Sequence, residues 1–204
     1  MNEILKEISR IGIVPVVKID NAKDAVPLAD ALIKGGLPCA EVTFRTAAAE
    51  EAIALMTKAF PEMLVGAGTV INKTQCEEAI NLGAKFIVSP GFSEEVAAYC
   101  NEKNIPYLGG CVTPTEVMTA ISYGCKTIKF FPCSNYGGLS TMKALAAAFP
   151  QVNFLPTGGI SDENLAEYLK WEKIFAVGGS WMMKGTPEEI AEKCKAAVEI
   201  AKSV

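Results

Sequence analysis

The amino-acid sequence predicts an α/β fold, a (β/α)₈ or TIM barrel, in a single domain over residues 1–204. Short apolar runs alternate with longer amphipathic segments eight times, which is typical of buried parallel strands followed by helices. No Pro-, Gly- or Ser-rich linker divides the chain, and each βα unit averages about 25 residues. An open doubly wound sheet is the competing architecture, and eight regular units favour the barrel over it.

The elements follow in order along the chain. We expect the eight strands at residues 12–19, 39–44, 63–66, 85–88, 106–108, 127–131, 153–155 and 173–177. We expect the eight helices at residues 25–33, 48–59, 75–82, 95–103, 116–123, 142–149, 164–170 and 188–201.

Local signals agree with several of these boundaries. The glycines at 36, 83 and 124 fall where helices should end. Two helices should begin with a capping threonine, a proline at the first helical position and a glutamate three residues after the cap. These two segments are Thr113-Pro114-Thr115-Glu116 and Thr186-Pro187-Glu188-Glu189.

Composition excludes several classes of chemistry. The chain has no histidine, which removes the Ser-His-Asp triad, the Cys-His dyad and His-ligated metals. Proton transfer must therefore use carboxylates, lysine, tyrosine, cysteine or water, and we expect neither a metal nor a cofactor. The 19 basic residues against 23 acidic ones give a net charge of −4, which argues against a nucleic-acid partner.

Cysteine use and hydropathy indicate a cytoplasmic protein with no membrane partner. The seven cysteines are odd in number and contain no C-x-x-C pair, so we interpret them as reduced thiols that mostly fill the core. No stretch reaches the roughly 20 apolar residues that span a bilayer. Cys111 and Cys133, which follow the fifth and sixth predicted strands, are expected near the mouth of the barrel.

The second predicted strand carries polar residues on one face. By period-two alternation Glu41, Thr43 and Arg45 point into the barrel, while the intervening apolar residues meet the helices. Functional groups of such barrels collect at the carboxyl ends of the strands. The alternative interpretation is an internal salt bridge that only fills space, although buried charges are costly to retain for stability.

The same alternation places Lys129 inside the barrel on the sixth strand. Burial among apolar residues and a nearby cation such as Arg45 would favour a neutral amine, which can attack a ketone to form a Schiff base. The alternatives are an amine that snorkels outward or that pairs with Glu41 for stability. Lys18 is the rival lysine, in a less enclosed position that suits ligand steering.

Glycine pairs follow the last two predicted strands. Thr157-Gly158-Gly159 and Gly178-Gly179-Ser180 occupy the loops where barrel enzymes commonly bind phosphate, through backbone amides and a hydroxyl. One such pair usually marks a tight turn, whereas two at adjacent strand ends favour a phosphate site. Gly66-Ala67-Gly68-Thr69 lacks a dinucleotide fingerprint and instead indicates close backbone approach, with Thr69 as a hydroxyl donor.

Six motifs in order along nearly the whole chain carry a resemblance to a known family. They are Glu41-Val42-Thr43-Phe44-Arg45-Thr46, Gly66-Ala67-Gly68-Thr69-Val70, Ser89-Pro90-Gly91, Ile128-Lys129-Phe130-Phe131-Pro132, Pro156-Thr157-Gly158-Gly159-Ile160 and Gly178-Gly179-Ser180-Trp181. Together they resemble the 2-keto-3-deoxy-6-phosphogluconate (KDPG) / 4-hydroxy-2-oxoglutarate (KHG) aldolases. The resemblance implies a metal-free class I aldolase, a lyase that binds a small 2-keto acid, on a (β/α)₈ barrel that is usually a homotrimer.

The resemblance also implies a role for each matched residue. Lys129 would form the Schiff base and Glu41 would transfer protons. The substrate-binding residues would be Arg45, Thr69 and Pro90 at the pyruvoyl end and Gly158, Gly159, Gly179 and Ser180 at the phosphate. The chain departs from the family after the sixth strand, where it reads Cys133-Ser134-Asn135-Tyr136-Gly137-Gly138.

Other functions on the same barrel stay open at this point. A phosphosugar isomerase, epimerase or decarboxylase would use the phosphate loops without a covalent lysine, and a non-catalytic sugar-phosphate-binding module would bind without turnover. Within the aldolases, the sequence does not choose among KDPG, its galactonate epimer and KHG.

Overall fold

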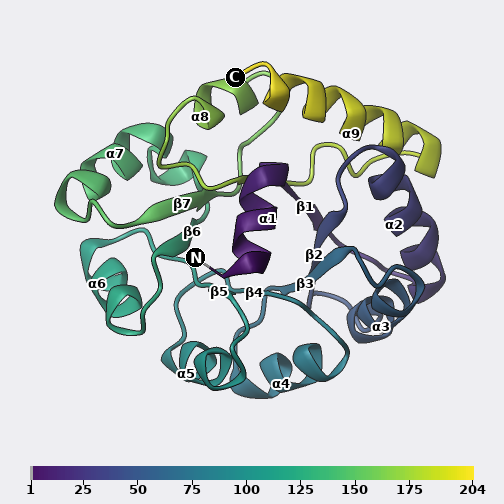
Figure 1. Ribbon diagram of the computed structural model, residues 1–204, viewed down its shortest axis with the longest axis horizontal. Coiled ribbons are helices and arrows are strands. Elements are labelled where there is room, and N and C mark those ends of the chain that lie inside the picture. The colour runs from purple at the N-terminus through teal and green to yellow at the C-terminus, as the bar shows by residue number, and fades with distance from the viewer. Residues whose placement is uncertain (1) are drawn as a thin grey trace.

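The computed structural model describes residues 2–204 and shows an α/β fold in which helices surround parallel strands (Figure 1). The strands are β1 (Ile13–Val17), β2 (Cys39–Thr43), β3 (Leu64–Gly68), β4 (Ile87–Val88), β5 (Tyr107–Leu108), β6 (Thr127–Phe130), β7 (Asn153–Pro156) and β8 (Val177–Gly179). The helices are α1 (Glu3–Ile11), α2 (Ala25–Lys34), α3 (Ala49–Ala59), α4 (Lys73–Asn81), α5 (Glu94–Lys103), α6 (Pro114–Ser122), α7 (Gly138–Ala148), α8 (Leu165–Leu169) and α9 (Pro187–Lys202), with short 3₁₀ turns at Ala22–Asp24 and Ser134–Tyr136.

The strands curl around a common interior. Six of them form one parallel sheet in the order β5-β4-β3-β2-β1-β8, and β6 and β7 form a parallel pair. Single parallel bridges connect the pair to its neighbours, from Gly110 to Lys129 on one side and from Thr157 to Gly178 on the other. The carboxyl ends of all strands therefore gather at one end of the molecule.

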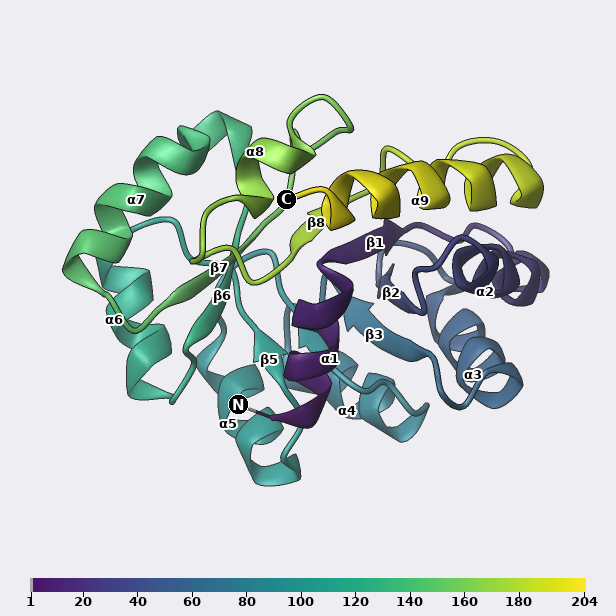
Figure 2. The same ribbon diagram turned by 45° about the horizontal axis from the view of Figure 1, so that its top comes forward.

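Helix α1 lies apart from the ring formed by α2–α9 and crosses one end of the strands (Figure 1, Figure 2). No helix was predicted at these residues. Ile4, Leu5, Ile8 and Ile11 nevertheless recur at helical spacing and pack on the apolar interior. Asn2 caps the helix by accepting a hydrogen bond from the Ile4 amide at 2.8 Å. The amino end of the strand interior is thus closed by packing.

The eight predicted helices are present as α2–α9, with shifts of a few residues at their ends. Both predicted capping boxes are confirmed, at Thr113 with Glu116 and at Thr186 with Glu189. Gly36, Gly83 and Gly124 have φ angles of +83°, +95° and +81°, the left-handed region that glycine adopts most easily.

Two strands end later in the chain than predicted, because glycines near their ends were interpreted as loops, and the eighth also begins four residues later. The eighth strand was predicted at residues 173–177, but β8 comprises Val177–Gly179 and pairs with β1 through Gly178 and Gly179. Likewise β3 continues through Gly68, which pairs with Thr43. A Cβ atom at Gly178 would overlap the Thr157 hydroxyl, and one at Gly68 would overlap the Glu41 carboxylate. These glycines make room for neighbouring polar side chains while the strand continues.

The apolar side chains form two clusters. The larger lies between the strands and the surrounding helices and includes Ala40, Val42, Ile128 and Phe130, the predicted outward-facing residues. The smaller fills the amino-terminal half of the strand interior, and we call it the inner cluster. Its members are Ile8, Val14, Cys39, Leu64, Phe86, Val88, Leu108, Leu155, Phe175 and Ala176.

Candidate functional site

A buried acid and a buried amine meet in the interior that the strands enclose. They lie just beyond the inner cluster, toward the carboxyl ends of the strands. Glu41 on β2 and Lys129 on β6 are paired, with Lys129 Nζ 2.9 Å from Glu41 Oε1 and 3.3 Å from Oε2. Their side chains are only 1% and 6% exposed. The alternation on both strands therefore points the predicted residues into the interior, and Gly68 leaves the space that the carboxylate occupies.

The surroundings of Lys129 differ from the expectation of purely apolar neighbours and a nearby cation. Its partner is the Glu41 carboxylate, and the ring centroid of Phe131 lies 5.5 Å from Nζ. Arg45 is exposed, and its Nε donates to Thr43 Oγ1 at 3.0 Å. A neutral amine at Lys129 can therefore arise by passing a proton along the hydrogen bond to Glu41.

A pocket of about 290 Å³ opens at the ends of β7 and β8. Neither Lys129 nor Glu41 lines it, but it is lined by Phe131, the residue whose ring lies 5.5 Å from Lys129 Nζ. Five of the predicted residues line it together: Arg45, Gly158, Gly159, Gly179 and Ser180. Gly158 and Gly159 have φ angles of +93° and +84°, and a Cβ atom at 159 would overlap Ser134. Such a backbone brings amide groups close to a ligand, as an anion site requires.

Thr69 and Pro90 lie at the same end of the strands but outside the lining of that pocket. Thr69 directly follows β3 and has a φ angle of +57°, an unusual and strained conformation for a β-branched residue. Pro90 follows β4. Gly110 packs so closely on Pro90 that a Cβ atom at residue 110 would overlap the Pro90 carbonyl. The strained backbone holds Thr69 in one fixed position near the ends of β2 and β3.

The other residues that line the pocket were not predicted as site residues, and two of them carry groups suited to a polar ligand. Thr157 follows the inner residue Leu155 by two positions, so its side chain also points inward, and within residues 2–204 its buried hydroxyl has no hydrogen-bond partner. The period-two alternation could have identified it. Lys184 also lines the pocket and is exposed. Nothing in its local sequence distinguishes it from a surface lysine.

Cys111 and Cys133 do not line this pocket, in contrast to the expectation that they lie near the mouth. Both are buried, at 1% and 0% exposure, and burial raises the pKa of the Cys111 thiol to about 12. Such thiols are poor nucleophiles.

In the part of the chain that the structure describes, no cluster of three or more His, Cys, Asp or Glu side chains could hold a metal ion. Over the same residues, no helix has the length and apolar character of a membrane span.

Comparisons with known proteins agree on one family. The profile of the KDPG and KHG aldolases matches residues 2–196. A 2-dehydro-3-deoxy-phosphogluconate aldolase of Treponema pallidum is 45% identical over 183 residues, covering 90% of this chain and 87% of that protein.

Solved structures give the same result. The 4-hydroxy-2-oxoglutarate / 2-dehydro-3-deoxyphosphogluconate aldolase from TTHB1 superposes with a TM-score of 0.91 at 38% identity, covering 98% of this chain and 99% of that one. The KDPG aldolase of Legionella pneumophila, solved with pyruvate captured as a covalent carbinolamine, has a TM-score of 0.88 at 36% identity, covering 100% and 98%. This chain belongs to the KDPG and KHG aldolase family.

Proposed function

We propose that this protein is a class I lyase that cleaves KDPG to pyruvate and glyceraldehyde 3-phosphate, and/or KHG to pyruvate and glyoxylate. The observation that carries the proposal is the buried Lys129–Glu41 pair beside a glycine-lined pocket. A lysine, its proton acceptor and an anion site are the groups that an imine-forming aldolase of a phosphorylated keto acid needs.

Lys129 begins the reaction by attacking the C2 ketone of the substrate. Glu41, at hydrogen-bonding distance, accepts the ammonium proton and then returns it as the carbinolamine loses water. The iminium ion that results withdraws electrons, so deprotonation of the C4 hydroxyl breaks the bond between C3 and C4. The aldehyde leaves, C3 of the enamine is protonated, and water releases pyruvate from Lys129. No metal is needed because the iminium is the electron sink.

The remaining residues position the substrate. Arg45 and Thr69 would bind the carboxylate of the pyruvoyl end, and Pro90 would pack on that end. The amides at Gly158, Gly159 and Gly179 and the Ser180 hydroxyl would bind the phosphate. To these we add Lys184, a pocket cation that complements the phosphate charge, and Thr157, whose unpartnered hydroxyl suits a hydroxyl of the substrate.

We also propose the finer architecture that the family resemblance implies. The bridges at Gly110–Lys129 and Thr157–Gly178 support closure of the strands into a complete (β/α)₈ barrel, with residues 1–204 as one catalytic domain. A homotrimer in the cytoplasm follows from the resemblance and from the unpaired cysteines. Sedimentation analysis of the purified protein tests the trimer, and a monomer would contradict it.

A phosphosugar isomerase, epimerase or decarboxylase, or a non-catalytic binding module, receives less support. None of these needs a buried lysine paired with a carboxylate at the carboxyl ends of the strands.

The test is an assay of pyruvate released from KDPG and from KHG, coupled to lactate dehydrogenase. We expect turnover of at least one substrate and an unchanged kcat after exhaustive chelation. Binding of both substrates without pyruvate release would contradict the proposal. Loss of turnover on chelation, with recovery on adding a divalent ion, would replace the imine by a metal-dependent mechanism.

A further inference from the structure

Two buried cysteines lie side by side on neighbouring helices, far along the chain from one another. Cys76 on α4 and Cys100 on α5 place their sulfur atoms 3.5 Å apart, and both side chains are 0% exposed. Both are free thiols. The aldolase chemistry uses neither of them, and a hydrogen bond between thiols is weak, so the contact calls for another explanation.

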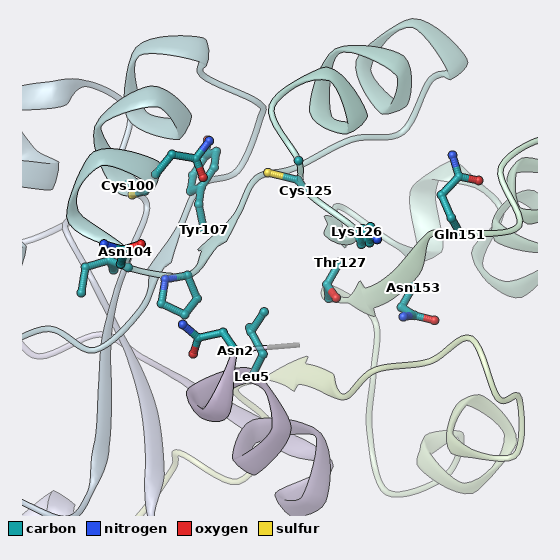
Figure 3. Close-up of a pocket in the computed structure, with 14 residues that line it drawn as sticks. Asn2, Leu5, Cys100, Asn104, Tyr107, Cys125, Lys126, Thr127, Gln151 and Asn153 are labelled. Carbon is teal, nitrogen blue, oxygen red and sulfur yellow. The ribbon is translucent and has the colours of Figure 1, made fainter.

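A second cavity, at the opposite end of the molecule from the aldolase site, is lined by Cys100 but not by Cys76. It measures about 480 Å³ and lies at the amino ends of β5, β6 and β7, next to α1. Cys100 and the half-buried Cys125 line it, with Tyr107 beside them (Figure 3). None of the residues proposed for the aldolase site lines this cavity. Cys100 lies in the wall of this cavity but is 0% exposed, so a small solute reaches its sulfur when the wall opens locally.

We propose that Cys76 and Cys100 form a modification site, oxidised to a reversible intramolecular disulfide by small hydroperoxides that enter this cavity. The Cys100 sulfur attacks one peroxide oxygen and the O–O bond breaks. That oxygen stays on Cys100 as a sulfenic acid, and the other leaves as water or, from an organic hydroperoxide, as an alcohol. The Cys76 sulfur then attacks the Cys100 sulfur. The S–S bond forms and hydroxide leaves as water, so that two thiols lose two electrons and two protons and hydrogen peroxide yields two waters.

The electrostatics assign the second step to Cys76. The hydrogen bond between the two thiols lowers the pKa of Cys76, while that same bond and burial raise the pKa of Cys100. Cys76 is therefore the more readily ionised thiol of the two, and its sulfur lies 3.5 Å from the Cys100 sulfur that it attacks. Cys100 reacts slowly as a thiol but is the member of the pair that lines the cavity.

The disulfide would join two helices that follow the site loops. Helix α4 follows the Thr69 loop, and α5 follows the loop that contains Pro90. Closing the sulfurs to bonding distance needs a movement of about 1.5 Å, within the range of side-chain rotation. The inference does not depend on the aldolase proposal, because it is read out on the thiols and not on turnover.

The experiment treats the reduced, folded wild-type protein with hydrogen peroxide, blocks the remaining thiols with N-ethylmaleimide in denaturant, and maps peptides without reductant. We expect a linked peptide pair that contains Cys76 and Cys100, two fewer maleimide labels, and full reversal by dithiothreitol. A Cys100–Cys125 linkage, or a linkage that forms only in denaturant, would overturn the proposal.

Two variants sharpen the result. Cys76→Ser should abolish the linkage and leave a sulfenic acid at Cys100 that dimedone traps. Cys125→Ser is the matched control, since it removes a thiol from the same cavity and should leave the linked pair in full yield. Loss of the linkage in the Cys125→Ser variant would overturn the assignment. If Cys76→Ser does not fold, the wild-type peptide map still decides the question.

Discussion

The strand interior has two halves with opposite character, although the same strands build both. On β2, Cys39 belongs to the apolar inner cluster, and two residues later Glu41 forms the buried ion pair. On β7, Leu155 packs in the inner cluster, and two residues later the Thr157 hydroxyl lies buried without a partner. Thus a single step of the alternation separates a half that stabilises the fold from a half built for chemistry.

The two halves of the strand interior have opposite effects on the stability of the fold. The amino half is closed by α1 and gains free energy from apolar burial. The carboxyl half buries a charge pair and an unpartnered hydroxyl, and it holds the half-buried Thr69 in left-handed conformation, each of which costs stability. Substitutions in the amino half should therefore change mainly the free energy of unfolding, and substitutions in the carboxyl half should change mainly the catalytic constants.

The largest effect is expected for Lys129→Met in the carboxyl half. Without the amine no imine forms, so kcat for KDPG cleavage should fall by roughly 10⁴-fold or more. The coupled pyruvate assay measures it. Circular dichroism must show a folded variant, since removing one partner leaves Glu41 buried alone. Retention of a substantial fraction of kcat in a folded Lys129→Met protein would contradict the role of Lys129.

In the amino half, Phe86→Ala should act on stability. The ring is fully buried and packs on Gly66, so its loss should lower the free energy of unfolding by about 3–5 kcal/mol. Urea denaturation measures this change. Under native conditions the folded fraction should retain kcat within a few-fold. A large fall in kcat with little loss of stability would show that the two halves are not separate in function.

The phosphate end of the site should show a smaller and selective effect. A side chain at 179 would overlap Trp181, so Gly179→Val should disturb the pocket, and Lys184→Gln should remove charge without steric change. We expect Lys184→Gln to lower kcat/KM for KDPG by roughly 10- to 100-fold. For KHG, which has no phosphate, the value should stay nearly unchanged. An equal loss with both substrates would make these loops structural turns.

Thr157→Val should have the smallest effect, and it should change stability and activity in different ways. Valine fills the same volume without the unpartnered hydroxyl, so the free energy of unfolding should stay constant or rise by about 1 kcal/mol. The lost hydrogen bond to substrate should lower kcat/KM by roughly 10-fold. Thr43→Val is the matched stability control, because that hydroxyl donates to the Val17 carbonyl and accepts from Arg45. Only the control should lose stability.

Much of this arrangement could be predicted from the sequence. Alternation on β2 and β6 predicted that Glu41 and Lys129 point inward, and the two capping boxes predicted Thr113 and Thr186 as helix caps. These predictions succeed because each depends on local geometry and burial alone.

The features that were missed depend on contacts across the fold. The strand character of Gly68 and Gly178 depends on side chains from neighbouring strands, Glu41 and Thr157, which need the space that glycine leaves. The partner of Lys129 and the place of Lys184 depend on how β2, β6 and the last loop meet in space. Helix α1 was missed because its charged residues obscured an apolar stripe that only the strand interior explains.

One measurement tests the role of Lys129 most directly. The protein is incubated with pyruvate, reduced with borohydride, digested and mapped by mass spectrometry. We expect a single reduced pyruvate adduct on the peptide that contains Lys129, and its absence when pyruvate is omitted. An adduct on Lys18, or none at all in a protein that cleaves KDPG, would contradict the assignment of Lys129 as the imine-forming residue.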